Sequence, residues 1–148
     1  MTLSRAFAIA FAVAAFLLAS FIVARWLTSE NRERTAVIDL LRAQAGGDAP
    51  SMLAQLDGCA ADARCRAVVG RNARTLRRPG DVRILSYDSQ TAHSVLAERG
   101  TTRVAWDVGN ASLPVVQCVK VERGGVPILG GALVLRGIGP KISGDGSC

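Results

Sequence analysis

The sequence predicts an α+β protein, in which an N-terminal transmembrane helix precedes about three helices packed on an antiparallel sheet of four to five strands. Three observations lead to this prediction. The stretch from Ala6 to Ala24 contains no charged residue. Between this stretch and Pro79, the apolar residues recur with a helical period. After Pro79 they alternate with a period of two, which indicates strands and a helical-then-strand order.

The stretch from Ala6 to Ala24 has the length and composition of a membrane span. A helix of nineteen residues is roughly 28 Å long, close to the roughly 30 Å hydrocarbon core of a bilayer. Trp26 follows at the position of an interfacial aromatic residue. We therefore expect residues 1–27 to form an uncleaved signal anchor. The alternative is a secretory signal peptide cleaved after Ala24, although the apolar region of such peptides usually spans about 7 to 15 residues.

Residues 28–148 are enough for one small domain, which we divide into a helical part (28–79), a strand-rich part (80–140) and a glycine-rich tail (141–148). All four phenylalanines precede this domain, so its core must consist of aliphatic side chains around Trp106. A core of small residues is thinly filled, and covalent cross-links are then useful.

The first helix of the domain begins at Thr28 or Ser29, or else the membrane helix continues to the Gly46-Gly47 stop. Its apolar residues share one face, on which we place Val37, Ile38, Leu40, Leu41 and Ala45. We expect its charged residues to face away from the core, namely Arg32, Glu33, Asp39 and Arg42.

Two shorter helices follow. Asp48 and Pro50 are start signals for the segment SMLAQL, which ends at Asp57-Gly58. The next helix has an apolar face made of Cys65, Val68, Val69, Ala73 and Leu76, and it ends at Pro79-Gly80.

The strand-rich part favours an antiparallel meander. The candidate strands are Val82 to Tyr87, Thr91 to Ala97, Thr101 to Val108, Val115 to Arg123 and Ala132 to Ile138. Short connections such as Glu98-Arg99-Gly100 suit hairpins. In the third of these strands, Trp106 falls on the face that packs, and Asp107 falls on the opposite, wet face.

The four cysteines predict disulfides. Cys59 and Cys65 close a small loop, and Cys118 lies in a strand whereas Cys148 is the last residue. Four cysteines allow three pairings, of which 59 with 65 and 118 with 148 is the least strained. Cys118 shares a strand face with Lys120 and Glu122, so the tail would return over the outer face of the sheet.

The alternative of a zinc site needs tighter ligand spacing than the five residues between Cys59 and Cys65, and we expect no metal and no cofactor. Disulfides persist outside the cytoplasm. We therefore predict a single-pass protein of the cell membrane with its C-terminal domain outside the cytoplasm. The flanking cations oppose this orientation, because Arg5 stands against Arg25, Arg32 and Arg34.

Arginines without intervening acidic residues follow Asp62, and four of them form a candidate anionic-surface patch: Arg64, Arg71, Arg74 and Arg78. Such a patch would suit an anionic lipid surface. The plainer interpretation is a solvated helix face, which we favour. Nucleic acid is not an expected partner, because the stretch contains no aromatic residue.

No residue pattern predicts catalysis. His93 is the only histidine, and no nucleophile elbow accompanies the nearby serines and aspartates. The Gly-Gly pairs lack the lysine of a phosphate-binding loop.

The element order, from the helix AVIDLLRAQAGGD through two further helices to the antiparallel strands, resembles the cystatin-like, or nuclear-transport-factor-like, cone fold. The resemblance covers about residues 30 to 140 and includes Gly47-Asp48 before the short second helix. It implies an extracytoplasmic domain behind one membrane helix. Enzymatic members place Asp, His or Tyr inside the cone, and here Tyr87, His93 and Trp106 are the candidate pocket residues. No functional residue transfers position by position.

Three functions stay open. The first is a non-catalytic, membrane-tethered binding or scaffolding module of the cell envelope, with another envelope protein as partner. The second is a small-ligand carrier or enzyme with a cone pocket. The third is a pilin-like subunit, which a long N-terminal helix, a sheet and a C-terminal disulfide loop resemble. A prepilin would carry Glu five residues into the mature chain, whereas cleavage before Phe7 puts Phe11 there.

Overall fold

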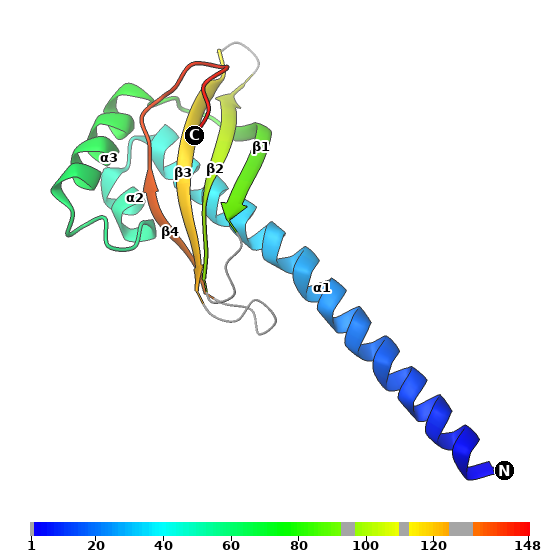
Figure 1. Ribbon diagram of the computed structural model, residues 1–148. Coiled ribbons are helices and arrows are strands. Elements are labelled where there is room, and N and C mark those ends of the chain that lie inside the picture. Colours follow the sequence, from blue (N-terminus) through cyan, green and yellow to red (C-terminus); the bar gives the residue numbers. More distant parts are fainter. Residues whose placement is uncertain (1, 93–96, 110–112, 125–131) are drawn as a thin grey trace. The chain divides into compact units, whose positions relative to one another are not determined.

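The computed structural model describes residues 2–92, 97–109, 113–124 and 132–148 (Figure 1). The chain divides into two compact units, residues 1–32 and 33–148. Helix α1 (Thr2–Gly46) contributes to both, so the helix does not restart at Thr28 or Ser29.

The first unit contains the candidate membrane span. Among the described residues, the segment Phe7–Ala24 is the one helix stretch long and apolar enough to cross a bilayer, and none of it is buried within the protein. Its four phenylalanines are all exposed. An exposed surface of this composition is stable only when something apolar covers it, and a lipid bilayer has the required thickness.

The second unit begins with the part of α1 that packs in the core. Val37, Leu40, Leu41 and Ala45 are buried, as their spacing predicts. Glu33 is a correction to the sequence analysis, because it is 1% exposed rather than turned to solvent. The reason is geometric: Glu33 precedes Val37 by four residues and Leu40 by seven, which places it on the same helix face.

Helices α2 (Ala49–Gln55) and α3 (Ala63–Thr75) follow, each started by an aspartate. Asp48 accepts hydrogen bonds from the Ser51 hydroxyl at 2.5 Å and from the Ser51 amide at 3.0 Å, and these bonds, the hydroxyl first, lower the pKa of Asp48. α3 ends earlier than Pro79, at the C-cap residue Leu76. Its buried side is formed by Val69, Asn72, Ala73 and Leu76.

The sheet is an antiparallel meander in the order β1-β2-β3-β4. Its strands are β1 (Val82–Ala92), β2 (Ala97–Val108), β3 (Val115–Gly124) and β4 (Ala132–Ile138). Of the expected strand from Thr91 to Ala97, Thr91 and Ala92 belong to the end of β1 and Ala97 begins β2, whereas residues 93–96 lie outside the described residues. The expected turn Glu98-Arg99-Gly100 lies within β2, where Arg99 pairs with Ala92 and with Glu122.

One face of the sheet packs on the helices. Trp106 and Val104 of β2 and Val115 and Val119 of β3 are fully buried against the core residues of α1, α2 and α3. In Figure 1 α2 and α3 lie together beside β4, and Leu56, the C-cap residue of α2, forms a bridge with Leu135 of that strand.

The opposite face of the sheet is less exposed to solvent than the sequence predicts, which corrects the expectation for the face of β2 that carries Asp107. Ala105 and Asp107 are 9% and 7% exposed, so both faces of β2 are covered in this region. Part of the cover is the C-terminal tail: Arg103 of β2 donates a hydrogen bond from Nε to the Gly146 carbonyl at 2.9 Å.

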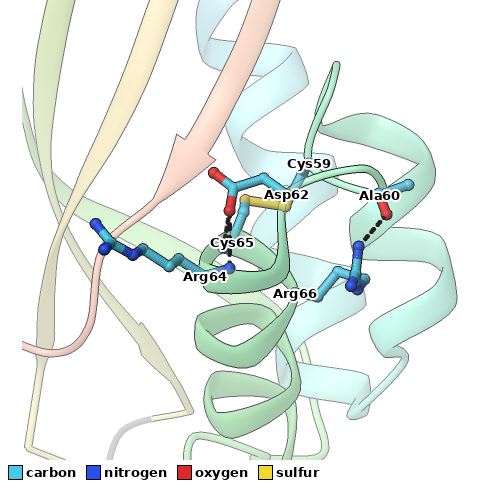
Figure 2. Close-up of a disulfide and its surroundings, with 6 residues drawn as sticks. All are labelled: Cys59, Ala60, Asp62, Arg64, Cys65 and Arg66. Carbon is cyan, nitrogen blue, oxygen red and sulfur yellow. Dashed lines mark hydrogen bonds between the residues drawn. A yellow bond between two sulfur atoms is a disulfide. The ribbon is translucent and has the colours of Figure 1, made fainter.

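The cysteines form the two pairs that their spacing favours, Cys59 with Cys65 and Cys118 with Cys148. The second disulfide closes a separation of 30 residues and holds the tail to β3. Figure 2 shows the first, at the start of α3, where Asp62 Oδ1 accepts hydrogen bonds from the amides of Arg64 and Cys65.

Candidate functional site

The most unusual side chain in the second unit is the buried carboxylate of Glu33. Its Oε1 accepts hydrogen bonds from Tyr87 Oη at 2.5 Å, Thr102 Oγ1 at 2.8 Å and Ser89 Oγ at 3.2 Å. Its Oε2 pairs with the guanidinium of Arg123. We call these five residues the Glu33 cluster.

The sheet register explains how these residues meet. Tyr87 and Ser89 are two positions apart on β1, so both point to the same face. Thr102 of β2 lies directly opposite Ser89. Arg123 lies on β3 at an even spacing from the buried Val119 and Val121, and therefore on their face. α1 supplies the one carboxylate to which all four side chains are directed.

The surroundings of Glu33 favour its ionised form, which pairs with Arg123. Burial alone raises the pKa of Glu33, but the hydrogen bonds from Tyr87 and Thr102 and the charge of Arg123 outweigh it and hold the pKa below its usual 4.5. Burial and the neighbouring Glu33 carboxylate raise the pKa of Tyr87. Glu33 is thus an anion near neutral pH and Tyr87 a neutral donor, so neither is suited to exchange protons with a substrate at that pH.

A second buried polar group, the glutamine cluster, joins the elements at the other end of the core segment of α1. Gln117 Oε1 accepts hydrogen bonds from Gln44 Nε2 at 2.8 Å and from Trp106 Nε1 at 2.9 Å. Gln117 Nε2 and Asn72 Nδ2 both donate to the Gly139 carbonyl, at 3.0 and 2.9 Å. This cluster connects α1, β2, β3, α3 and Gly139, the residue that follows β4.

The candidate pocket residues have separate partners. The Tyr87 hydroxyl is bonded to Glu33, and the fully buried Trp106 is bonded to Gln117. His93 lies outside the described residues. The structure therefore places Tyr87 and Trp106 on one face of the sheet, each engaged by an interior polar group and neither offering its polar atom to a ligand.

The arginines of the candidate anionic-surface patch do not all share one environment. Arg64, Arg71 and Arg74 lie on α3 and are exposed. Arg78 comes after the helix has ended and is half-buried. Its amide donates to the Ala45 carbonyl at 2.9 Å, and its guanidinium donates to the Leu113 carbonyl at 2.7 Å. Arg78 thus belongs to the fold, and Arg64, Arg71 and Arg74 belong to the surface.

Among the described residues, no group of three or more His, Cys, Asp or Glu side chains is arranged to hold a metal ion. Comparison with protein-family models, with curated proteins and with solved structures finds no match to this chain. Its function therefore has to be argued from its own residues.

The sequence analysis did not identify the α1 residues of the two polar clusters, Glu33 and Gln44. A signal was present: Glu33 and Gln44 continue the apolar positions Val37, Leu40 and Leu41 at intervals of three and four residues. A polar residue on an apolar face needs a buried partner. Tyr87, Thr102 and Gln117 are candidates for such partners because they alternate with the outward positions of their strands.

Proposed function

We propose that the protein is a non-catalytic, membrane-tethered module of the cell envelope, whose second unit lies outside the cytoplasm and binds or scaffolds another envelope protein. The observation that carries the proposal is the continuity of α1. One helix contains the candidate span Phe7–Ala24 and continues into the core of the folded unit, where the Glu33 cluster holds it to three strands.

The chemistry of the interior supports a non-catalytic role. The Glu33 carboxylate is buried and paired within its cluster, and the glutamine cluster consists of amides and an indole that do not titrate near neutral pH. Both clusters link secondary structure elements to each other. They are suited to holding a shape, which is what a binding module requires.

The two disulfides support the location outside the cytoplasm, because cytosolic thiols are kept reduced. Fusions test the orientation. Alkaline phosphatase fused after Cys148 is expected to be active, and green fluorescent protein fused at the same place is expected to be dark. The same phosphatase fused to residues 28–148 without the anchor is the control and should be inactive. A fluorescent and phosphatase-inactive pair of full-length fusions would overturn the proposal.

Membrane attachment is tested on the untagged chain. We expect it to resist extraction at alkaline pH and to have the mass of a chain that is not cleaved after Ala24. A soluble product beginning at Arg25 would instead establish the signal-peptide alternative.

A pilin-like subunit is the second candidate. It is supported by the 45-residue helix α1, the antiparallel sheet that follows it and the disulfide between Cys118 and Cys148. In that case the mature chain would begin at Phe7 and would be recovered in filaments sheared from cells. A membrane-retained chain of full mass and no filaments would leave the tethered module as the function.

A further inference from the structure

The outer side of α3 presents three arginines in a row. Arg64, Arg71 and Arg74 are spaced by seven and three residues, which puts them on one side of the helix over about 15 Å. All three are exposed. Ala67, the residue between them on this side, is exposed as well. We call this surface the arginine face of α3.

Most other arginines in the described part of the second unit have partners, with Arg34 and Arg77 as the exceptions. Arg42 pairs with Asp39, Arg83 with Asp107, Arg99 with Glu122, Arg123 with Glu33, and Arg136 with both Asp57 and Glu122. Arg66, Arg78 and Arg103 donate to backbone carbonyls.

The arginine face instead gathers three arginines without such partners on one side of α3. Within the described part of the chain, the guanidinium groups of Arg64, Arg71 and Arg74 have neither an ion pair nor a hydrogen bond. Even Asp62, two residues before Arg64, uses its carboxylate to cap the helix backbone. Figure 2 shows the Arg64 side chain extended away from that carboxylate.

We propose that the arginine face is a docking surface for an acidic segment of a partner protein, with carboxylates spaced to meet the three guanidinium groups. The inference rests on the proposed function and names the chemistry of the partner. Arginine presents a planar fork of N–H donors that matches a carboxylate with two parallel hydrogen bonds, so it is suited to reading acidic side chains at fixed positions.

The start of α3 is held in place, which favours a partner with a defined geometry. The disulfide between Cys59 and Cys65 and the Asp62 cap fix the first turn, and Arg66 donates to the Ala60 carbonyl at 2.6 Å (Figure 2). The backbone that carries the Arg64 side chain is therefore held in a fixed position. Preorganisation of this kind reduces the entropy lost on binding.

A protein partner is favoured over a lipid surface by the composition of α3. A helix that lies on a membrane inserts large apolar residues between its cations. The apolar residues of α3 are instead directed into the core, and none of the large exposed hydrophobic side chains of the described residues belongs to this helix.

The test uses the full chain in nanodiscs of phosphatidylcholine and a fluorescent peptide of ten glutamates as the acidic probe. The first variant carries Arg64→Gln, Arg71→Gln and Arg74→Gln. The matched control removes the same charge from exposed positions elsewhere, with Arg34→Gln, Lys120→Gln and Lys141→Gln. Peptide affinity is measured at low salt by anisotropy, and the fold of each variant is checked by circular dichroism.

We expect the triple variant of the arginine face to lose roughly tenfold in affinity, because three exposed ion pairs each contribute a small factor, and the control to change by less than about twofold. Equal losses in both variants would mean that net charge alone attracts the peptide, and would overturn the proposal. Absence of peptide binding by the wild type would overturn it as well.

The same nanodiscs are mixed with phosphatidylglycerol vesicles and separated by flotation. If the wild-type nanodiscs float with the vesicles and the arginine-face substitutions abolish this flotation, the surface binds lipid and not a protein partner. That result would also overturn the proposal. These outcomes are independent of the fusion experiment. A domain that proves cytoplasmic contradicts the proposed function, whereas a domain outside the cytoplasm that does not bind the peptide contradicts only the docking surface.

Discussion

A single carboxylate, Glu33, joins α1 to three strands. Tyr87 and Ser89 belong to β1, Thr102 to β2 and Arg123 to β3, and all four side chains reach the same two oxygens. The partners are separated from Glu33 by 54 to 90 residues in sequence. Glu33 is therefore one of the points at which polar contacts fix α1 to the sheet.

The substitution Glu33→Gln keeps the shape of this side chain and removes its charge. We expect it to lower the free energy of unfolding by about 2 kcal/mol, because Arg123, whose side chain is 26% exposed, loses its counter-ion and the hydroxyl donors lose a charged acceptor. Urea unfolding of the chain in detergent micelles measures this. Arg34→Gln, one residue away and exposed, is the control and should stay within about 0.5 kcal/mol. Equal losses in the two variants would contradict the role of the cluster.

The stability difference between the wild type and Glu33→Gln should depend on pH. The pKa of Glu33 is lowered in the folded state, so its contribution is complete above the unfolded value near 4.5 and is lost as the pH falls through the folded value. The difference in stability between wild type and Glu33→Gln should be constant from about pH 6 to 7 and should shrink below about pH 4.5. A difference that grows on acidification would show that the sign is wrong.

Glu33 also shows why part of the site was beyond sequence analysis. The spacing of Glu33 from Val37 and Leu40 indicates its helix face, but a charged residue is ordinarily solvated, and its partners on three distant strands cannot be identified from local spacing. The disulfide pairing needed less information, because it depended on the short separation of Cys59 from Cys65 and on the strand face of Cys118. Local spacing was sufficient to predict the disulfides. It was not sufficient to predict which distant residues pair with Glu33.

At the scale of elements, α3 separates arginines that the sequence placed together. Changing Arg64, Arg71 and Arg74 to Gln should alter stability by no more than about 0.5 kcal/mol for each residue, since all three are exposed. Adding Arg78→Gln should cost about 1 kcal/mol more, because this side chain donates to the Leu113 carbonyl. Thermal unfolding of the triple and quadruple variants gives the difference. Identical melting temperatures would mean that the Arg78 contact contributes nothing.

The glutamine cluster is the second link between elements, and a double-mutant cycle measures it. Gln117→Leu leaves the buried donors of Gln44 and Trp106 without their acceptor, which we expect to cost about 3 kcal/mol. Adding Gln44→Leu removes one of these stranded donors. The double variant should therefore lose at least about 1 kcal/mol less than the sum of the single changes. Additive losses would show that the two amides are energetically independent.

The boundaries of helices and strands could likewise be predicted where local contacts set them and not where distant strand pairing does. Asp48 starts α2 as its sequence signal indicates, because a capping side chain acts on an amide three residues away. The segment Glu98-Arg99-Gly100 has the composition of a turn but lies in β2, because Ala92 on one side and Glu122 on the other extend the ladder through it. Pairing on both sides overrides the local preference of a single glycine.

At the scale of the whole molecule, the disulfide between Cys118 and Cys148 compensates for a glycine-rich C-terminal part. Cys148→Ser should lower the free energy of unfolding by about 3 to 4 kcal/mol, since the closed loop spans 30 residues. The shorter loop of Cys59 and Cys65 should give about 2 kcal/mol in Cys65→Ser. Thermal unfolding compares the two, and alkylation should label Cys118 in the first variant. A peptide linking Cys118 to Cys59 or Cys65 in the non-reduced protein would contradict both pairings.

The continuity of α1 has a mechanical consequence. In the proposed membrane-tethered arrangement, tension along α1 from the candidate span Phe7–Ala24 would reach the folded unit first at Glu33. An ion pair and three hydrogen bonds bear that load before the aliphatic contacts of Val37 and Leu40 do. The residue that orients the helix on the sheet is thus also the one that resists its being drawn out.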